Sequence, residues 1–140
     1  MKTYTTAISI AAPVERVWRT LTQGMPEAPK TFGILQIDGS LARNSRIKIR
    51  SEVDPKRTFA LNVRAFDPPH RMVWQGGMPF GLFTGTRTFD VSSRDGSTWF
   101  DMTEVFSGPL SGLIVKSMPD LTPSFEKFAS ALKERAETHE

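Results

Sequence analysis

The sequence predicts an α+β fold, in which an antiparallel sheet packs against a C-terminal helix, on three observations. From Leu35 onward, short segments of alternating apolar and polar residues follow one another, as in consecutive antiparallel strands. Asp95-Gly96 is typical of a two-residue hairpin turn. Beyond Gly108, apolar residues recur every three to four positions, as on one face of a helix.

The chain length and composition fit a single domain spanning residues 1–140. The 140 residues include no Cys, which excludes disulfides and thiolate zinc sites and is consistent with a reducing compartment. No apolar run approaches the ~20 residues that a membrane span requires. We therefore expect a cytoplasmic, soluble protein with no stable membrane insertion, as a monomer or a homodimer.

The N-terminal third begins with a strand and a short helix. Tyr4–Ile10 alternates in the manner of a strand with one buried face. Pro13 suits the first position of a helix of two to three turns, whose apolar stripe includes Val17 and Trp18. Two prolines and two glycines between Gly24 and Gly33 predict a loop or a broken helical turn.

The middle of the chain predicts an antiparallel meander. Its expected strands centre on 35–41, 47–49, 59–65 and 72–74, separated by turn residues such as Asn44 and Pro55. Gly76–Gly81 is expected to be a flexible connector. Its bulky residues Met78, Pro79 and Phe80 suit an ordinary capped loop or, as the second interpretation, a mobile gate.

The last two expected strands have a definite register. A hairpin turn at Asp95-Gly96 pairs residues whose numbers sum to 191, so Arg87 faces Glu104 on an otherwise apolar face. The same register places Asp90 opposite Asp101 on the other face, which is unfavourable and leaves a bulge or a longer turn as an alternative.

The C-terminal apolar stripe runs from Leu110 to Leu132 and includes Leu113. Pro119 and Pro123 interrupt it, so we expect a kink or a restart, with Thr122 as N-cap and the second half ending at about Arg135. This helix is the partner expected to cover the apolar face of the sheet.

The order of several short motifs resembles that of one superfamily. The motifs are Ala-Pro-Val-Glu-Arg-Val-Trp at 12–18, Arg-Met-Val-Trp-Gln-Gly at 71–76, Leu-Phe-Thr-Gly at 82–85 and Thr-Glu-Val-Phe-Ser-Gly at 103–108. Together they resemble the SRPBCC superfamily, which includes START lipid-transfer domains, birch-pollen-allergen-like proteins and polyketide cyclase/dehydrases. The chain departs from many relatives at Arg87, where they often carry His, and at Gly24–Gly33, which lacks their Trp-Asn-Pro cluster.

The resemblance implies a helix-grip fold: a curved antiparallel sheet of six to seven strands wrapped around a long C-terminal helix, with one or two short helices after the first strand. It also implies an internal cavity for a hydrophobic small molecule. The expected lining consists of residues assigned to the inward face of the sheet and helix: Phe59, Leu61, Val63, Trp74, Phe83, Arg87, Phe89, Phe100, Met102, Glu104, Phe106, Met118, Leu121 and Phe125.

Arg87 and Glu104 are the chemically distinctive residues of that set. A structural ion pair is the first interpretation, a ligand anchor the second and catalysis the third, with Glu104 as the best catalytic candidate. His70 and His139 belong to no visible catalytic or metal-binding arrangement, and no phosphate-loop motif is present. We expect no cofactor and no metal.

The charge of +3 is unevenly distributed. Arg43–Arg71 holds eight Lys or Arg against three Asp or Glu, a net +5, whereas the rest of the chain sums to −2. Arg46, Lys48 and Arg50 are expected to project outward from one strand, as a solvated face. The inward aromatics are unsuited to stacking bases, so we expect no nucleic-acid partner, while attraction to anionic lipid surfaces remains a hypothesis.

Three classes of function follow from these observations. The preferred one is binding or transport of a small hydrophobic or amphipathic ligand, such as a lipid, a polyketide or an aromatic metabolite, with Arg87 and Glu104 orienting its polar end. The first alternative is a polyketide cyclase or dehydratase that uses the same cavity. The second is a protein-interaction module of the chaperone-activator type, because the resemblance includes relatives that act on chaperones.

Overall fold

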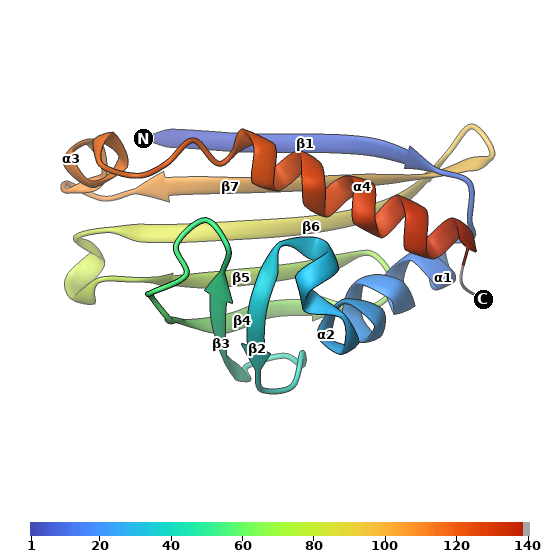
Figure 1. Ribbon diagram of the computed structural model, residues 1–140, viewed down its shortest axis with the longest axis horizontal. Coiled ribbons are helices and arrows are strands. Elements are labelled where there is room, and N and C mark those ends of the chain that lie inside the picture. Colours follow the sequence, from blue (N-terminus) through green and yellow to red (C-terminus); the bar gives the residue numbers. More distant parts are fainter. Residues whose placement is uncertain (139–140) are drawn as a thin grey trace.

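The fold was obtained as a computed structural model that describes residues 1–138, so His139 lies outside the described residues. Seven antiparallel strands form one curved sheet with the order β1-β7-β6-β5-β4-β3-β2 (Figure 1). The strands are β1 (Lys2–Ile10), β2 (Ile34–Asp38), β3 (Arg46–Ser51), β4 (Phe59–Asp67), β5 (Arg71–Gly77), β6 (Thr84–Arg94) and β7 (Ser97–Ser107). The α+β fold with a seven-stranded sheet is therefore confirmed.

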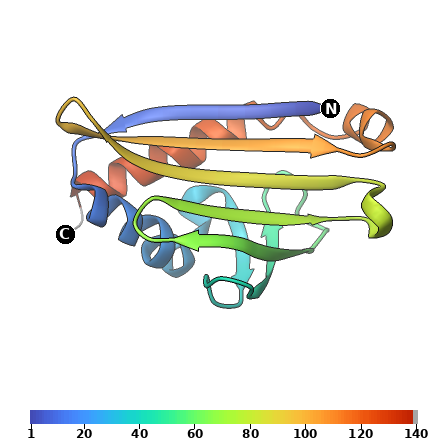
Figure 2. The same cartoon turned by 180° about the vertical axis from the view of Figure 1, so that it is seen from behind.

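The helices lie on one face of the sheet, and Figure 2 shows the opposite face with the helices behind it. The long C-terminal helix crosses that face obliquely, and two short helices follow β1 at one end (Figure 1). The helical elements are α1 (Val14–Arg19), η1 (Thr20–Gly24), α2 (Met25–Glu27), η2 (Pro29–Phe32), η3 (Pro79–Gly81), α3 (Ser111–Lys116) and α4 (Thr122–Thr138).

The β6–β7 hairpin has the register expected from its turn. Arg87 pairs with Glu104, and Asp90 pairs with Asp101, so the two facing carboxylates are accommodated without a bulge. Asp95 and Gly96 both have positive φ, at 50° and 82°, as a type I′ turn requires. The Asp90 carboxylate is neutralised from the other side, because Arg71 Nε donates to its Oδ1 at 2.7 Å.

The helical run after β1 is longer than expected. Pro13 has an extended backbone and is the N-cap of α1, not its first residue. The chain then stays helical through Gly24, where the sequence predicts a loop or a broken helical turn, because a wider π-helical turn lets the Met25 N–H bond the Thr20 carbonyl. Complete burial of Met25 in the core favours this continuation over a break.

The β2 region also differs from the expected pattern. The sequence alternation assigns Leu35, Ile37 and Leu41 to one strand, whereas β2 ends at Asp38 and Leu41 lies in the following turn. A register shift between Ile34 and Gln36 changes the inward residue, so that Ile34 is buried in place of Leu35. A bulge of this kind bends the strand and is invisible to a simple period-two count.

The C-terminal segment is two helices, as a restart at the prolines predicts. Its details differ: Thr122 is the first residue of α4 and not its N-cap, since Leu121 O accepts from the Phe125 N–H, and α4 runs to Thr138. Leu113, which the apolar stripe assigns to the core, is 72% exposed, because α3 is displaced onto the ends of β1 and β7. β5 likewise continues through Gly77 and β6 begins at Thr84, so the β5–β6 connector lies two residues further along the chain than expected.

A bond between α4 and the end of β1 fixes one end of the helix against the sheet. The Glu137 carboxylate accepts from the Ala11 N–H at 2.8 Å and from Lys133 Nζ at 2.6 Å, and Lys133 also donates to Ser9 O. The hydrogen bond from Lys133, followed by that from Ala11, lowers the pKa of Glu137 below its ordinary value.

This lowered pKa gives a first testable prediction. Because the folded-state pKa is depressed, the stabilisation from Glu137 is present at neutral pH and is lost as the pH falls through that lowered pKa. Glu137→Gln is expected to lower the melting temperature slightly at pH 7 and to match the wild type in acid. Exposed Glu134, changed to Gln, is the control. A pH-independent difference would contradict the prediction.

No helix within residues 1–138 is both long and apolar enough to cross a membrane.

Candidate ligand-binding site

Five side chains form one row across the inner face of the sheet. Cross-strand pairing aligns Tyr4 of β1 with Glu104 of β7, Glu104 with Arg87 of β6, Arg87 with Trp74 of β5, and Trp74 with Val63 of β4. Because alternate residues of a strand share a face, the Arg–Glu pair lies on the same side as the buried apolar residues and beneath α4. The row therefore places one charged pair in an apolar wall.

The Arg87–Glu104 pair is well formed and only partly buried. Arg87 Nε and Nη2 both lie 2.7 Å from Glu104 Oε1. The two side chains are 23% and 13% exposed, and the guanidinium carbon lies 4.8 Å from the ring centroid of Phe125 on α4. The ion pair is thus held between the sheet and the helix and keeps some contact with solvent.

Two glycines paired across β5 and β6 make room beside this ion pair. Gly76 pairs with Gly85, and a Cβ added to Gly85 would lie 3.0 Å from Glu104 Oε2 and 3.1 Å from the Phe106 ring. A Cβ on Gly76 would lie 2.5 Å from Leu61 Cδ2. The missing side chains let Glu104 and Leu61 lie over the strand backbone.

The sequence-predicted lining residues separate into two groups. Val63, Trp74, Phe89, Phe100 and Met102 are almost completely buried. Around Phe128 of α4, the rings of Phe89 and Phe100 pack with centroid distances of 5.9 and 6.2 Å. These residues belong to the buried hydrophobic core.

The second group lies around Arg87 and Glu104. Phe83 and Phe106 stack with ring centroids 5.5 Å apart, while Leu121 and Phe125 are buried and Met118 is half-buried beside them. Leu61 is half-buried, and Phe59 at the start of β4 is 39% exposed. Surfaces available to a ligand are therefore concentrated at this end of the sheet.

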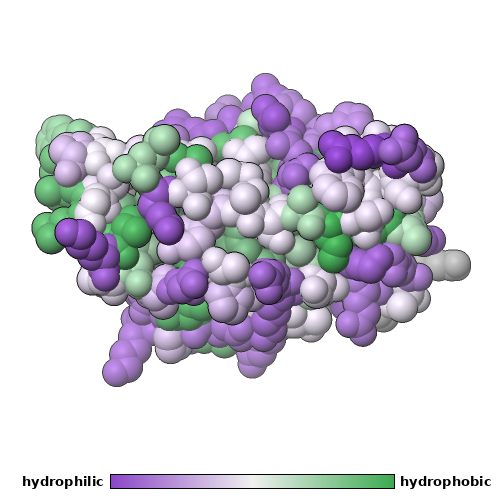
Figure 3. All heavy atoms as spheres, turned by 90° about the horizontal axis from the view of Figure 1, so that it is seen from above, coloured by the Kyte–Doolittle hydropathy of each residue, from purple (hydrophilic) through white to green (hydrophobic). Residues whose placement is uncertain are grey.

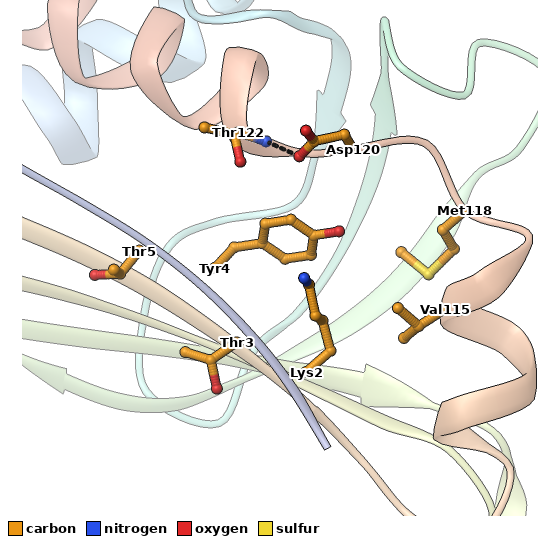
Figure 4. Close-up of a pocket in the computed structure, with 8 residues that line it drawn as sticks. All are labelled: Lys2, Thr3, Tyr4, Thr5, Val115, Met118, Asp120 and Thr122. Carbon is orange, nitrogen blue, oxygen red and sulfur yellow. Dashed lines mark hydrogen bonds between the residues drawn. The ribbon is translucent and has the colours of Figure 1, made fainter.

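A groove of about 420 Å³ opens at the same end, between the start of β1 and the segment that joins α3 to α4 (Figure 4). It is lined by Lys2, Thr3, Tyr4, Thr5, Val115, Met118, Asp120 and Thr122. Tyr4 also packs against Phe106 and Phe125, with its ring centroid 6.2 and 6.0 Å from theirs. The groove thus adjoins the Arg87–Glu104 row through Tyr4.

Sequence reasoning missed Lys2, Tyr4 and Asp120 as site residues. Tyr4 could have been found from the sequence, because the alternation of apolar and polar residues in the first strand already assigns it to the inner face of the sheet. Asp120 is held by the start of α4: its Oδ1 accepts from the Thr122 N–H at 3.0 Å, and that bond lowers the pKa of the carboxyl group. Lys2 Nζ lies 5.2 Å from the Tyr4 ring centroid.

Trp74 adds an unused donor to the row. Its side chain is 2% exposed, and its indole Nε1 has no hydrogen-bond partner among the described residues. A buried donor of this kind is costly to leave unpaired. The indole N–H of Trp74, the residue that pairs with Arg87 across β5 and β6, is therefore a second polar group on the inner face.

Within residues 1–138, no group of three His, Asp or Glu side chains is arranged to hold a metal ion. Gly76 and Gly77 precede only the single 3-10 turn η3, and Gly81 and Gly85 lead into or lie within β6, whereas a phosphate-binding loop leads into a full helix.

The family model described as polyketide cyclase/dehydrase and lipid transport matches residues 1–137. The sequence matches no curated protein significantly.

Solved structures resemble the fold over nearly its whole length. They include protein MLL2253 from Mesorhizobium loti (TM-score 0.75, 18% identity, covering 99% of each chain). The Aha1 dimer from Colwellia psychrerythraea has a TM-score of 0.73 and 19% identity, with 99% of this chain and 98% of that chain covered. Truncated norcoclaurine synthase from Thalictrum flavum has a TM-score of 0.72 and 13% identity, with 99% and 95% covered.

Proposed function

The chain belongs to the polyketide cyclase/dehydrase and lipid transport family, and from this premise we propose that it binds a small, largely apolar molecule beside Arg87 and Glu104. The observation that carries the proposal is the partly exposed ion pair in an otherwise apolar inner face. Ligand sites typically combine apolar walls with a few fixed polar groups, and this end of the sheet has both.

The surrounding residues supply the walls and an entrance. The half-buried ring of Phe83, stacked on that of the buried Phe106, would offer aromatic surface to an apolar ligand, while Phe125 packs over the guanidinium from the core. The groove beside Tyr4 would be the entrance, because Tyr4 lines it and also packs against Phe106. Arg87 and Glu104 would orient the polar end of the ligand.

The geometry favours binding over catalysis. A cyclase or dehydratase would need Glu104 to accept or donate a proton, yet its Oε1 already accepts from two nitrogens of Arg87. Arg87 remains protonated and cannot serve as a base. The likeness to norcoclaurine synthase and to the Aha1 dimer is one of fold, and it favours neither an enzyme nor a protein-interaction module.

Native mass spectrometry tests the proposal, first on gently purified protein and then after addition of a fatty acid, a sterol and a flavonoid. We expect a one-to-one adduct with at least one of them. The double variant Arg87→Met/Glu104→Gln should weaken that binding about tenfold, since lost orienting hydrogen bonds each contribute about 1 kcal/mol.

The outward pair Arg71–Asp90 provides a matched control, because it also bridges neighbouring strands at 2.7 Å. Arg71→Met/Asp90→Asn should leave binding unchanged. Absence of any adduct in the wild type, or equal weakening by both double variants, would contradict the proposed site.

A further inference from the structure

One end of the molecule exposes large apolar side chains from two separate segments. Phe80 is 98% exposed, Leu113 72%, Met78 42% and Leu82 36%. Figure 3 shows hydrophobic residues gathered at the end where α3 and the β5–β6 connector lie. These four residues are called the apolar tip below.

The apolar tip is held in place by backbone contacts. Leu110 N–H bonds the Leu82 carbonyl at 3.0 Å, and Met78 N–H bonds the Phe83 carbonyl at 2.8 Å. Gly108, with φ of 102°, lies so close to the connector that a Cβ would be 2.6 Å from Gly81 O. The two segments therefore form one built surface.

Phe80 combines almost complete exposure with an unusual backbone conformation. Its φ of 61° lies in the left-handed region, which is uncommon for a residue other than glycine. Proline precedes it and glycine follows it. Exposing an aromatic ring on a strained turn has no benefit for the isolated protein, so this residue points to a partner.

The segments that carry the apolar tip contain no acidic residue. Segments 76–89 and 105–119 contain no Asp or Glu, while Lys116 ends α3 and Lys2 lies beside α3 at the start of β1. Asp120 follows the second segment and lines the same groove as Lys2, and its carboxylate accepts from the Thr122 N–H. The tip therefore presents apolar side chains flanked by cations.

We propose that the apolar tip docks reversibly on an anionic lipid bilayer. Phe80 and Leu113 would enter the boundary between headgroups and acyl chains, while Lys116 and Lys2 would lie near lipid phosphates. A second copy of the chain suits the tip less well. Four side chains fall short of the ~800 Å² per partner that a stable interface buries, and two tips would bring like charges together.

Docking in this orientation would bring the candidate binding site to the membrane. The groove lined by Lys2, Val115 and Met118 adjoins α3, so it would open near the bilayer surface (Figure 4). Such an orientation would allow ligand to pass between the site and the membrane, a consequence that rests on the proposed function. Docking of the apolar tip does not depend on the proposed function, and it is measured with protein to which no ligand has been added.

Vesicle flotation tests the docking. The wild type is expected to bind phosphatidylserine/phosphatidylcholine vesicles and to bind pure phosphatidylcholine much less. Phe80→Ser should weaken binding to the mixed vesicles about tenfold, and Lys116→Glu should weaken it by a similar factor. Both residues lie at the surface, so circular dichroism and the melting temperature should remain those of the wild type.

Lys48→Glu, on the outward face of β3, is the matched charge control and should have little effect. Equal weakening by Lys48→Glu and Lys116→Glu, with Phe80→Ser unchanged, would show general electrostatic adsorption and overturn the proposal. A dimer in solution that dissociates on Phe80→Ser, without vesicle binding, would assign the tip to a second copy. A wild type that binds neither vesicle would overturn the proposal outright. Loss of small-molecule binding with docking intact would contradict the proposed function alone.

Discussion

Phe128→Ala is expected to lower the free energy of unfolding by about 3–5 kcal/mol, the cost of removing a fully buried aromatic ring and leaving a cavity. Phe128 is 2% exposed and lies at the centre of the inner face. Its ring centroid is 5.2, 5.9 and 6.2 Å from those of Phe32, Phe89 and Phe100. It thereby joins the segment before β2, strands β6 and β7, and helix α4.

Urea denaturation followed by tryptophan fluorescence measures this effect, and the melting temperature should fall by about 10 °C. Leu113→Ala removes an apolar side chain that is 72% exposed and should change the stability by less than about 0.5 kcal/mol. A loss below about 1 kcal/mol in Phe128→Ala would show that the region around α4 is loosely packed, contrary to the structure.

Arg87→Met is expected to cost about 2 kcal/mol of stability. The substitution leaves the Glu104 carboxylate without its cation at a position where the side chain is only 13% exposed. Removing one partner from a fully buried pair costs 3–5 kcal/mol, and the remaining access to water reduces that figure here. The cost arises mainly from the charge left behind, not from the attraction that is lost.

A double-mutant cycle separates these contributions. Arg87→Met/Glu104→Gln should recover at least half of the loss, because the stranded carboxylate is then replaced by a neutral amide. In the exposed Arg71–Asp90 pair, each single substitution should cost no more than about 1 kcal/mol. A double variant that is less stable than Arg87→Met alone would mean that Glu104 has other essential partners.

The Arg87–Glu104 pairing could be predicted from the sequence because two simple constraints act together. Asp95-Gly96 determines the turn, and a period of two then assigns every residue of the hairpin to a face and to a partner. The same logic predicted the inner face of β1, although it did not identify Tyr4 as part of the site.

Elements whose conformation depends on distant contacts were harder to predict. Gly24 and Pro26 locally disfavour a helix, yet burial of Met25 keeps the chain helical there. Leu113 fits the apolar periodicity of a core helix, but the restart at Thr122 detaches α3 from α4 and leaves Leu113 exposed. Sequence periodicity indicates which side chains share one face of a helix or strand, but it does not indicate whether that face packs against the core or is exposed to solvent.

The same limit applies to the predicted lining of the cavity. Alternation placed Phe89, Phe100 and Met102 on the inner face, where the structure has them. The alternation could not show that the Phe128 ring packs between Phe89 and Phe100, because the position of this ring depends on the angle at which α4 crosses the sheet. Their part in ligand binding therefore stays a prediction, as it does for the residues near Arg87.

The strand order also determines when the fold can be completed during synthesis. β1 is the first strand made, yet its only strand partner within the described residues is β7: Lys2 pairs with Phe106 and Ile10 with Thr98. Ribosomes add about 5–20 residues per second, so β1 waits some seconds for its partner. During that interval its apolar face is open to other chains, and the β6–β7 hairpin, whose contacts are local, can form before β1 adds to its edge.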